Sequence, residues 1–311
     1  MRQQNFLLSI IIPVYNEEQN IYLLLKRLLP VASKYSYEII FIDDGSSDNT
    51  FSQVKKQALK NKNIRLLSFT RNFGHQTALS AGYQSASGNC VVTIDADLQD
   101  PPELIDKLIE KWKHGFKIVY AQREEREDSL FKKTTASFFY RLINFLSDTP
   151  IPKDVGDFRL LDREVVNFLN KIPEKTRFLR GLVAWGGYSS TAVAFKRSKR
   201  LVGQTHYPLS KMINFALDGI TAFSTKPLKI ASYIGFFTSI FGAIGIIYAL
   251  FRRIFLPHQY WITGWTALFV AVMFFGGIQL LTIGIIGEYI GKIYKEIQGR
   301  PQYLVKEKVN I

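Results

Sequence analysis

Short apolar runs and amphipathic stretches alternate through the first 121 residues of the chain. The apolar runs are rich in β-branched and aromatic residues, which favour strands; they lie at 7–14, 38–43, 64–69, 91–95 and 118–121. The stretches between them repeat apolar residues with the period of a helix; they lie at 17–34, 49–61, 75–86 and 101–114. Strands that alternate with helices predict an α/β fold with a mainly parallel sheet covered on both faces.

Two later runs, 230–251 and 265–287, carry no Asp, Glu, Lys or Arg. A helix needs about 20 apolar residues to cross a hydrocarbon layer of about 30 Å, so each run is long enough to span a membrane. The short link 252–264 contains Pro257 and predicts a helical hairpin with both outer ends on one side. Buried core helices of a soluble protein are the alternative, and the length of both runs argues against it.

Charged residues beside the two runs indicate their orientation. Lys226 and Lys229 precede the pair and further basic residues follow it, so the positive-inside rule places the large N-terminal domain in the cytoplasm. Arg252 and Arg253 in the link oppose this, unless their side chains snorkel to the far headgroups. We therefore expect an integral membrane protein of the bacterial inner (plasma) membrane type.

These patterns divide the chain into four parts. Residues 1–210 form the α/β domain, which includes an amphipathic stretch near 129–147. Residues 211–226 form a juxtamembrane amphipathic helix, 227–290 hold the membrane pair, and 291–311 form a cytoplasmic tail. Apolar side chains beside Lys and Arg at helical spacing are typical of helices in the bilayer interface, although core helices show the same pattern.

The composition shows that the chain is strongly basic and rich in hydrophobic residues. Lys and Arg outnumber Asp and Glu by 40 to 26, which gives a formal charge of +14, and 47% of the 311 residues are hydrophobic. The hydrophobic content excludes a disordered chain, and the charge predicts an anionic partner. The single cysteine, Cys90, excludes a disulfide within the chain. The N-terminal apolar run ends at Pro13 without the cleavage site of a signal peptide.

Three acidic clusters follow three of the predicted strands, at 13–18, 43–48 and 95–100. The carboxyl ends of parallel strands form one edge of a sheet, where ligands bind. Asp95, Asp97 and Gln99 would project to one side while the backbone stays extended. Two carboxylates and an amide oxygen suit Mg²⁺ or Mn²⁺. Helix N-caps are the alternative for single residues, and Asp48 and Asp100 fit that role.

Missing motifs exclude several other kinds of site. No G-x-G-x-x-G follows the first strand and no G-x-x-x-x-G-K-[ST] occurs, which argues against a dinucleotide enzyme or a P-loop NTPase. No G-x-S-x-G elbow is present and Cys90 lies in an apolar run, so a serine or cysteine hydrolase is not supported. The four histidines have no zinc-ligand spacing. The acidic clusters and apolar runs also argue against a nucleic-acid-binding protein, which would carry a basic stripe.

Four motifs occur in order ahead of the apolar pair: PVYNEE at 13–18, DDGSSD at 43–48, RNFG at 71–74 and DADLQDPPE at 95–103. Together with the late pair, this set closely resembles the polyprenyl-phosphate glycosyltransferases of family 2, the group of dolichol-phosphate mannose synthases and bactoprenol glucosyltransferases. The resemblance implies a GT-A fold with a Rossmann-like sheet. It also implies that a sugar passes, with inversion, from a nucleotide diphosphate sugar to a polyprenyl phosphate such as undecaprenyl phosphate.

The apolar hairpin agrees with the bacterial glucosyltransferase branch, whose donor is UDP-glucose. The same fold with another donor remains an alternative: GDP-mannose, UDP-GlcNAc or UDP-amino-arabinose. A processive polysaccharide synthase would need a Gln-x-x-Arg-Trp motif, which the sequence lacks.

The resemblance implies roles for individual residues. Those around the donor nucleotide and its phosphates are Pro13, Tyr15, Glu17, Asp44, Asp95 and Arg123. Asp97 and Gln99 would hold the metal, Mg²⁺ or Mn²⁺, on the diphosphate. Those near the phosphate of the lipid acceptor are Lys133, Ser137 and Arg200.

Asp157, in the motif GDFRLL, matches the acidic position that the family has beside the reacting centre. With Asp97 it is the predicted catalytic residue. A phosphate monoester is already ionised near neutral pH, because its second pKa is about 6. We therefore expect Asp157 to orient the attacking phosphate or to accept its residual proton. The alternative is a helix cap before Asp162, and Arg159 would be an ordinary structural partner of Asp157.

Glycines recur in the second apolar run and just beyond it, at positions 276, 277, 284, 287 and 291. Small residues let membrane helices approach closely. The sequence therefore predicts a homo-oligomer formed through these helices.

Overall fold

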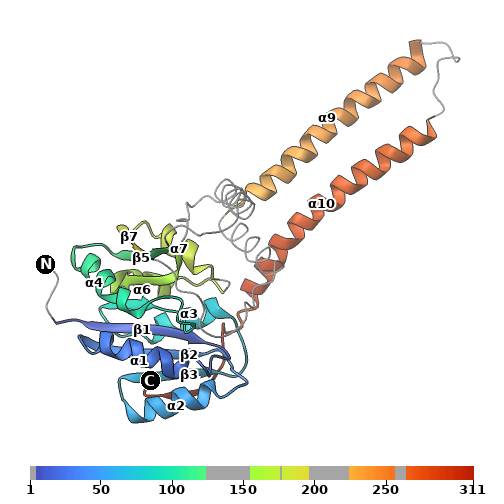
Figure 1. Ribbon diagram of the computed structural model, residues 1–311. Helices are drawn as coiled ribbons and strands as arrows, with labels where there is room; N and C mark the ends of the chain where they lie inside the picture. The colour runs from blue at the N-terminus through green and yellow to red at the C-terminus, as the bar shows by residue number, and fades with distance from the viewer. Residues whose placement is uncertain (1–4, 124–154, 176, 196–223, 256–263) are drawn as a thin grey trace. The chain divides into compact units, whose positions relative to one another are not determined.

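The computed structural model describes residues 5–123, 155–175, 177–195, 224–255 and 264–311 (Figure 1). The chain divides into two units. The first holds the described residues up to Phe195 together with the C-terminal segment 300–311, and the second holds those of 220–299. The amphipathic stretch near 129–147 and nearly all of the predicted helix at 211–226 lie outside the described residues.

A mixed eight-stranded sheet forms the first unit, with the strand order β7-β5-β6-β4-β1-β2-β3-β8. Its strands are β1 (Leu7–Val14), β2 (Ser36–Asp43), β3 (Ile64–Phe69), β4 (Cys90–Thr93), β5 (Ile118–Arg123), β6 (Val155–Asp162), β7 (Ser190–Phe195) and β8 (Val305–Val309). The pairs β1–β2, β1–β4, β2–β3 and β5–β7 are parallel. β6 runs antiparallel to β4 and β5, and β8 to β3. The five predicted strands and the mainly parallel sheet are confirmed.

Helices cover both faces of this sheet, as predicted (Figure 1). They are α1 (Ile21–Ala32), α2 (Thr50–Lys60), α3 (His75–Ser85), the short 3₁₀-helix η1 (Pro102–Leu104), α4 (Ile105–Lys113), α6 (Arg163–Lys171) and α7 (Leu179–Trp185). Ile10 and Ile12 of β1 share a buried cluster with Leu24 of α1. Ile11 contacts α3 on the other face, where a Cβ at Gly82 would lie 2.3 Å from its Cγ2. Burial on both faces explains the continuous apolar runs of the central strands.

The end of the chain is part of the sheet rather than a tail. The tail predicted at 291–311 is divided between the end of helix α10 (Trp265–Ile297) and the edge strand β8. Asn310 Nδ2 donates hydrogen bonds of 2.8 Å to the backbone oxygens of Ala58 in α2 and Ile64 at the start of β3. The ring of Tyr303 stacks on Phe69, with centroids 4.7 Å apart. These contacts close an edge of β3 that would otherwise be unpaired.

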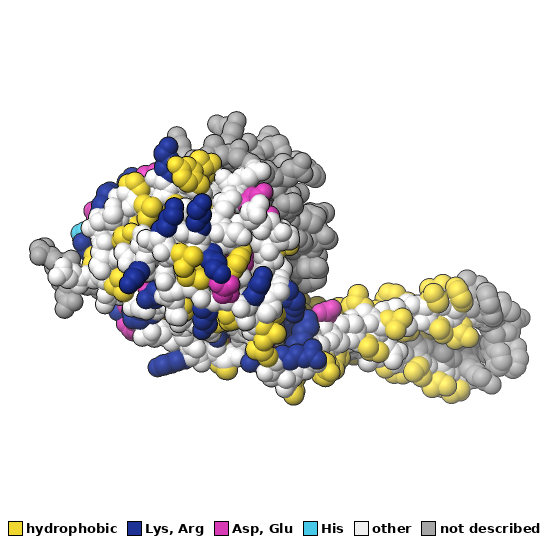
Figure 2. Space-filling model, turned by 90° about the horizontal axis from the view of Figure 1, so that it is seen from below, with side chains coloured by type: hydrophobic (Ala, Val, Ile, Leu, Met, Phe, Trp, Pro, Cys, Tyr) yellow, Lys and Arg dark blue, Asp and Glu magenta, His cyan; other side chains and the backbone are white. Residues whose placement is uncertain are grey.

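The second unit contains the helices α9 (Lys226–Phe255) and α10 (Trp265–Ile297), which include both predicted apolar runs. Their segments Lys226–Tyr248 and Leu268–Ile297 are long and apolar enough to cross a membrane, and only 6% and 0% of an 18-residue apolar window in each are buried. Figure 2 shows exposed hydrophobic side chains along the helices. Within the part of the chain that the structure describes, α9 and α10 are therefore not buried in a hydrophobic core, and the alternative of core helices is not supported. An exposed apolar surface of this extent is typical of a membrane or protein contact.

Basic side chains are spread over the first unit. On the face that Figure 2 shows, Lys and Arg are interspersed with hydrophobic and acidic side chains and do not gather in one stripe. Some of them have acidic partners, such as Arg27 with Glu103 at 2.8 Å and Lys34 with Asp106 at 2.6 Å. This distribution does not favour nucleic-acid binding.

Candidate active site

The acidic clusters follow strands that are neighbours in the sheet. β4, β1 and β2 lie side by side and run parallel, so the segments after them leave the sheet at one edge. Asn16 connects the first two clusters: its Oδ1 accepts the N–H of Ser47 at 2.8 Å, and its own N–H donates to Oγ of Ser46 at 3.0 Å. Asn16 has a φ of 54°, a conformation that asparagine tolerates better than most residues.

Three predicted donor-binding residues follow or end β1. Pro13 is buried in the strand, whereas the Tyr15 side chain is 47% exposed. The N–H of Glu17 donates to Oγ1 of Thr50 at 2.8 Å, and its carboxylate accepts the side-chain amide of Asn20 at 2.5 Å. Pro13 and Glu17 therefore shape the loop, while Tyr15 presents a ring to solvent.

Asp44 fastens a second loop to the end of β2. Its Oδ1 accepts the N–H of Phe73 at 2.6 Å, and its Oδ2 accepts that of Gly74 at 2.9 Å. Burial raises the pKa of this carboxyl group more than the two hydrogen bonds and nearby His75 lower it. The buried Asp44 thus holds the RNFG motif, and with it the start of α3, at the same edge of the sheet.

Gly45 is the tightest point of this junction, and its replacement is a test of the loop. Gly45 has a φ of +70°, and a Cβ there would lie 2.4 Å from the backbone carbonyl carbon of Arg71. We expect Gly45→Ala to lower the free energy of unfolding by about 3 kcal/mol, since positive φ costs about 1 kcal/mol and the backbone must also move. Gly187, at φ +65° with open space around its Cβ, is the control. In urea denaturation Gly187→Ala should lose only about 1 kcal/mol; equal losses would contradict the proposed clash.

The Asp95–Gln99 segment forms a turn, not the extended strand that was expected. β4 ends at Thr93, and Leu98 has a φ of 60°. Asp97 makes the turn itself, because its Oδ1 accepts the N–H of Gln99 at 3.2 Å. This local side-chain hydrogen bond competes with strand geometry. The alternation that would have put Asp95, Asp97 and Gln99 on one side of a strand is therefore wrong, and the turn positions these groups instead.

β6 brings Asp157 to the end of β4. The two strands pair antiparallel with Thr93 opposite Arg159, and the Thr93 hydroxyl donates to the backbone oxygen of Asp157. Asp157 lies within the strand, so the alternative of a helix cap there is wrong. The cap of α6 is Asp162, whose Oδ1 accepts the N–H of Glu164 at 3.1 Å.

Nitrogen donors surround the buried carboxylate of Asp157. The guanidinium group of Arg180 donates two hydrogen bonds to it, from Nη2 to Oδ2 at 2.8 Å and from Nε to Oδ1 at 3.2 Å. His75 Nε2 and Gln76 Nε2 each lie 3.5 Å from Oδ2, and Arg159 Nη2 lies 3.6 Å from Oδ1. Arg159 is 0% exposed, in agreement with its predicted role as a structural partner. A bidentate Arg–carboxylate pair fixes both side chains in one geometry.

His75 links the two acidic segments, and it was not among the residues predicted for the site. It is the first residue of α3, and its Nε2 lies 3.8 Å from Oδ1 of Asp95 as well as close to Asp157. Burial lowers the pKa of His75, but the hydrogen bond to Asp157 and the two carboxylate charges outweigh it, so the pKa is raised. The one available signal was its place directly after the RNFG motif. Arg180 was also missed, because nothing near it in the sequence points to Asp157.

The two carboxylates beside His75 have opposite pKa shifts. Burial acts to raise the pKa of Asp157, but Arg180, His75 and Arg159 more than offset it and hold this pKa well below its usual range. The pKa of Asp95 is raised, first by burial and then by the charges of Asp157 and Asp97. Asp157 is therefore the member of the pair that is ionised near neutral pH, and a weak proton acceptor.

Arg123 reaches the same cluster from β5. It ends that strand, and its Nη2 lies 3.1 Å from where a Cβ of Gly156 would be. The guanidinium group thus lies next to the residue that precedes Asp157, where it can contact an anion near the site. The predicted acceptor residues Lys133, Ser137 and Arg200 lie outside the described residues.

The donor set fits a Mg²⁺ or Mn²⁺ ion that shares its coordination with a substrate. In the described part of the chain, no group of three or more His, Cys, Asp or Glu could hold a metal ion by itself. Mg²⁺ is usually bound by one or two carboxylates and substrate phosphates rather than by an all-protein cage. The turn offers the Asp97 carboxylate and the Gln99 amide, with Asp95 two residues earlier.

The match to a family model over more than half of the chain defines the class of protein: it is a glycosyltransferase. Residues 9–169 match glycosyl transferase family 2, and the chain belongs to this family. The family predicted from the ordered motifs is confirmed.

Relatives of known name match nearly the whole chain. An uncharacterized glycosyltransferase of Bacillus subtilis, YkcC, is 47% identical over 97% of this chain and 94% of its own length. The SfII prophage-derived bactoprenol glucosyl transferase of Shigella flexneri is 42% identical over 96% of this chain and 97% of its own. A crystal structure of glucosyl-3-phosphoglycerate synthase from Mycobacterium tuberculosis, with Mn²⁺, UDP-glucose and phosphoglyceric acid, is 18% identical. It has a TM-score of 0.49 and covers 70% of this chain and 78% of that chain.

Proposed function

We propose that this enzyme transfers glucose from UDP-glucose to a polyprenyl phosphate at the cytoplasmic face of a membrane. The observation that carries this proposal is the 42% identity to a bactoprenol glucosyl transferase over 304 residues, a match that includes the helices α9 and α10. The acceptor is a lipid, and two apolar helices would hold the catalytic unit where that lipid resides. The basic residues at 226 and 229 favour the cytoplasmic side for the catalytic unit.

The reaction follows from the chemistry of the two substrates. An oxygen of the acceptor phosphate attacks the anomeric carbon of the sugar, while the bond from that carbon to the diphosphate breaks with inversion. The acceptor is ionised near pH 7 because its second pKa is about 6, so a strong base is unnecessary. Of the two roles expected for Asp157, its lowered pKa favours orientation over proton transfer. Asp157 contacts Arg180 and His75 and would position both side chains toward the reacting groups.

Negative charge develops on the diphosphate as it leaves. Asp97 and Gln99 would hold a divalent cation, Mg²⁺ or Mn²⁺, which neutralises that charge when bound. Arg123, at the end of β5, would contact the same phosphates, as Arg does at many phosphate sites. Tyr15 would meet the nucleotide, with Asp44 holding the neighbouring loop in place.

The test is transfer by purified protein in detergent. Radiolabelled UDP-glucose with undecaprenyl phosphate and Mg²⁺ or Mn²⁺ should give a labelled lipid, and EDTA should stop its formation. Parallel reactions with GDP-mannose, UDP-GlcNAc and UDP-amino-arabinose test the donor. Turnover of one of these donors in place of UDP-glucose would show that glucose is not the transferred sugar. If no donor gives a labelled lipid, the assignment of a polyprenyl phosphate as the acceptor is contradicted.

We also propose that the enzyme is a homo-oligomer held through α10. Gly277, Gly284 and Gly291 are seven residues apart and lie on one stripe of this helix, and a Cβ at each would meet open space. Such a stripe allows a second helix to approach closely. Native mass measurement in nanodiscs should find more than one copy per particle; only monomers would contradict this.

A further inference from the structure

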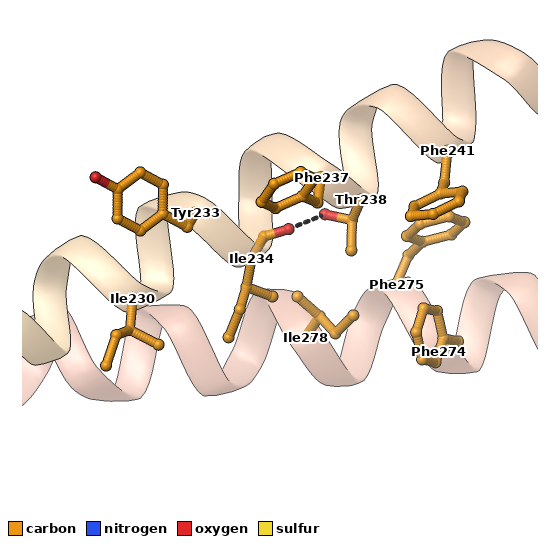
Figure 3. Close-up of a pocket in the computed structure, with 9 residues that line it drawn as sticks. All are labelled: Ile230, Tyr233, Ile234, Phe237, Thr238, Phe241, Phe274, Phe275 and Ile278. Carbon is orange, nitrogen blue, oxygen red and sulfur yellow. Dashed lines mark hydrogen bonds between the residues drawn. The ribbon is translucent and has the colours of Figure 1, made fainter.

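An apolar groove runs between α9 and α10 (Figure 3). Its volume is about 650 Å³, within the range of small-molecule sites. Its lining is Ile230, Tyr233, Ile234, Phe237, Thr238 and Phe241 from α9, with Phe274, Phe275 and Ile278 from α10. Thr238 adds no free polar group, because its Oγ1 donates to the backbone oxygens of Ile234 and Gly235 at 2.8 and 2.9 Å. The groove therefore suits an apolar ligand.

The groove occupies one end of the helical hairpin. Its α9 residues run from Ile230 to Phe241, a rise of about 17 Å along the helix. They begin four residues after the start of α9 at Lys226, at the end that continues from the catalytic unit. With α9 across a hydrocarbon layer about 30 Å thick, as the proposed function requires, the groove would lie in the half of the layer next to Lys226. The exposed Lys229 directly precedes it and supplies positive charge at the headgroup level.

The occupant of this groove differs from the partner of the glycine stripe. Successive residues of a helix are turned by about 100° around its axis. On α10 the mean direction of the glycine stripe is therefore about 130° away from the mean direction of the three groove residues, which are Phe274, Phe275 and Ile278. Close helix contact needs small residues, and the groove instead has bulky aromatic side chains. Aromatic rings bind flat π-systems and methyl groups through their faces, which is the chemistry of a branched, unsaturated chain.

We propose that the groove binds the first isoprene units of the polyprenyl acceptor, with its phosphate at the level of Lys229. This inference rests on the proposed function. The chain of the acceptor would enter the leaflet beside the catalytic unit, and its isoprene double bonds and methyl groups would lie against Phe237, Phe241 and Phe275. Binding of the chain would raise the affinity for long acceptors without changing the reaction at the phosphate.

The experiment compares a blocked groove with a matched control. Thr238→Phe fills the groove, whereas Ser239→Phe places the same ring on the next residue, outside the lining. KM is measured with undecaprenyl phosphate and with dimethylallyl phosphate, whose single isoprene unit is too short to fill the groove. We expect Thr238→Phe to raise the KM for undecaprenyl phosphate, relative to the KM for the short acceptor, about tenfold, which is equivalent to about 1.4 kcal/mol. Ser239→Phe should leave the ratio unchanged. An unchanged ratio in Thr238→Phe, or an equal rise in both variants, would overturn the proposal.

A binding measurement separates the groove from the reaction. A photoactivatable polyprenyl phosphate should label peptides that contain 230–241 or 274–278, and excess undecaprenyl phosphate should compete. Equal competition by phosphatidylglycerol would identify an ordinary acyl-chain site, and labelling elsewhere would exclude the groove. If wild-type protein is labelled in the groove but glucosylates no polyprenyl phosphate, the proposed function fails and the binding site stands.

Discussion

Asp157→Asn should lower the rate of sugar transfer by about 10²–10³-fold and the free energy of unfolding by about 3–5 kcal/mol. The stability loss follows from Arg159, whose fully buried guanidinium lies 3.6 Å from the Asp157 carboxylate. Removing the negative partner leaves a buried charge uncompensated. The activity loss follows from Arg180 and His75, which lose the carboxylate that positions them.

Asp106→Asn is the matched control for this variant. Asp106 is also paired, with Lys34 Nζ at 2.6 Å and the Tyr35 hydroxyl at 2.8 Å, but its side chain is 35% exposed. A surface pair of this kind contributes about 1 kcal/mol or less, and Asp106 lies on α4, away from the site residues. Urea denaturation of the full chain in detergent and the transfer assay measure both variants. Similar losses in the two would show that Asp157 has no special role.

The stability that Asp157 provides should depend on pH in one direction. Its pKa in the folded protein lies well below the usual value, so the carboxylate stabilises the fold fully above the unfolded-state pKa of about 3.9. Below that pH the unfolded chain binds a proton first, and the stabilisation declines as the pH falls toward the folded-state pKa. His75 titrates at higher pH and its raised pKa also depends on Asp157, so the test is made below pH 5, where His75 is protonated in both states. The difference in unfolding free energy between wild type and Asp157→Asn should shrink from pH 5 to pH 3, and a difference that grows over this range would contradict the lowered pKa.

The strands that could be predicted are those whose apolar runs are buried on both faces. β1 and β2 show this pattern because nearly all their side chains pack against helices. β8, with the sequence VKEKV, has no such run. Its place in the sheet depends on contacts such as those of Asn310 with the backbone of α2 and β3, which no local pattern reveals.

The candidate site was predictable in part, for a similar reason. The acidic motifs stand at the ends of parallel strands, so sequence order alone brings them to one edge. The partners of Asp157 come from 23 and 82 residues away along the chain, at Arg180 and His75, and only the packing of β6, α3 and α7 joins them. The turn at Asp97 escaped prediction because one side-chain hydrogen bond replaced the strand.

Asp97→Ala should lower the transfer rate by about 10³-fold or more, because the metal that stabilises the leaving diphosphate would lose its carboxylate ligand. Asp97 also shapes the turn, since its Oδ1 accepts the N–H of Gln99 at 3.2 Å. Asp97→Asn separates these roles: an amide oxygen can still accept that N–H, but it is a weaker ligand for a hard cation. We therefore expect Asp97→Asn to keep the fold and lose most of the rate, and to regain part of it at high Mn²⁺.

Asp48→Asn is the control at the same edge of the sheet. Asp48 Oδ1 accepts the N–H of Thr50 at 2.9 Å, and its Oδ2 accepts that of Glu18 at 3.2 Å. It is thus an acidic residue after a strand that serves the start of a helix, the role that was the alternative for these clusters. Asparagine keeps an acceptor oxygen for the N–H of Thr50 at the start of the helix and loses only the longer bond from Glu18, so the rate of Asp48→Asn should stay within about twofold, a change of about 0.5 kcal/mol or less in the barrier. If Asp97→Asn is as active as Asp48→Asn at low metal concentration, Asp97 is a turn residue and the metal must be held elsewhere.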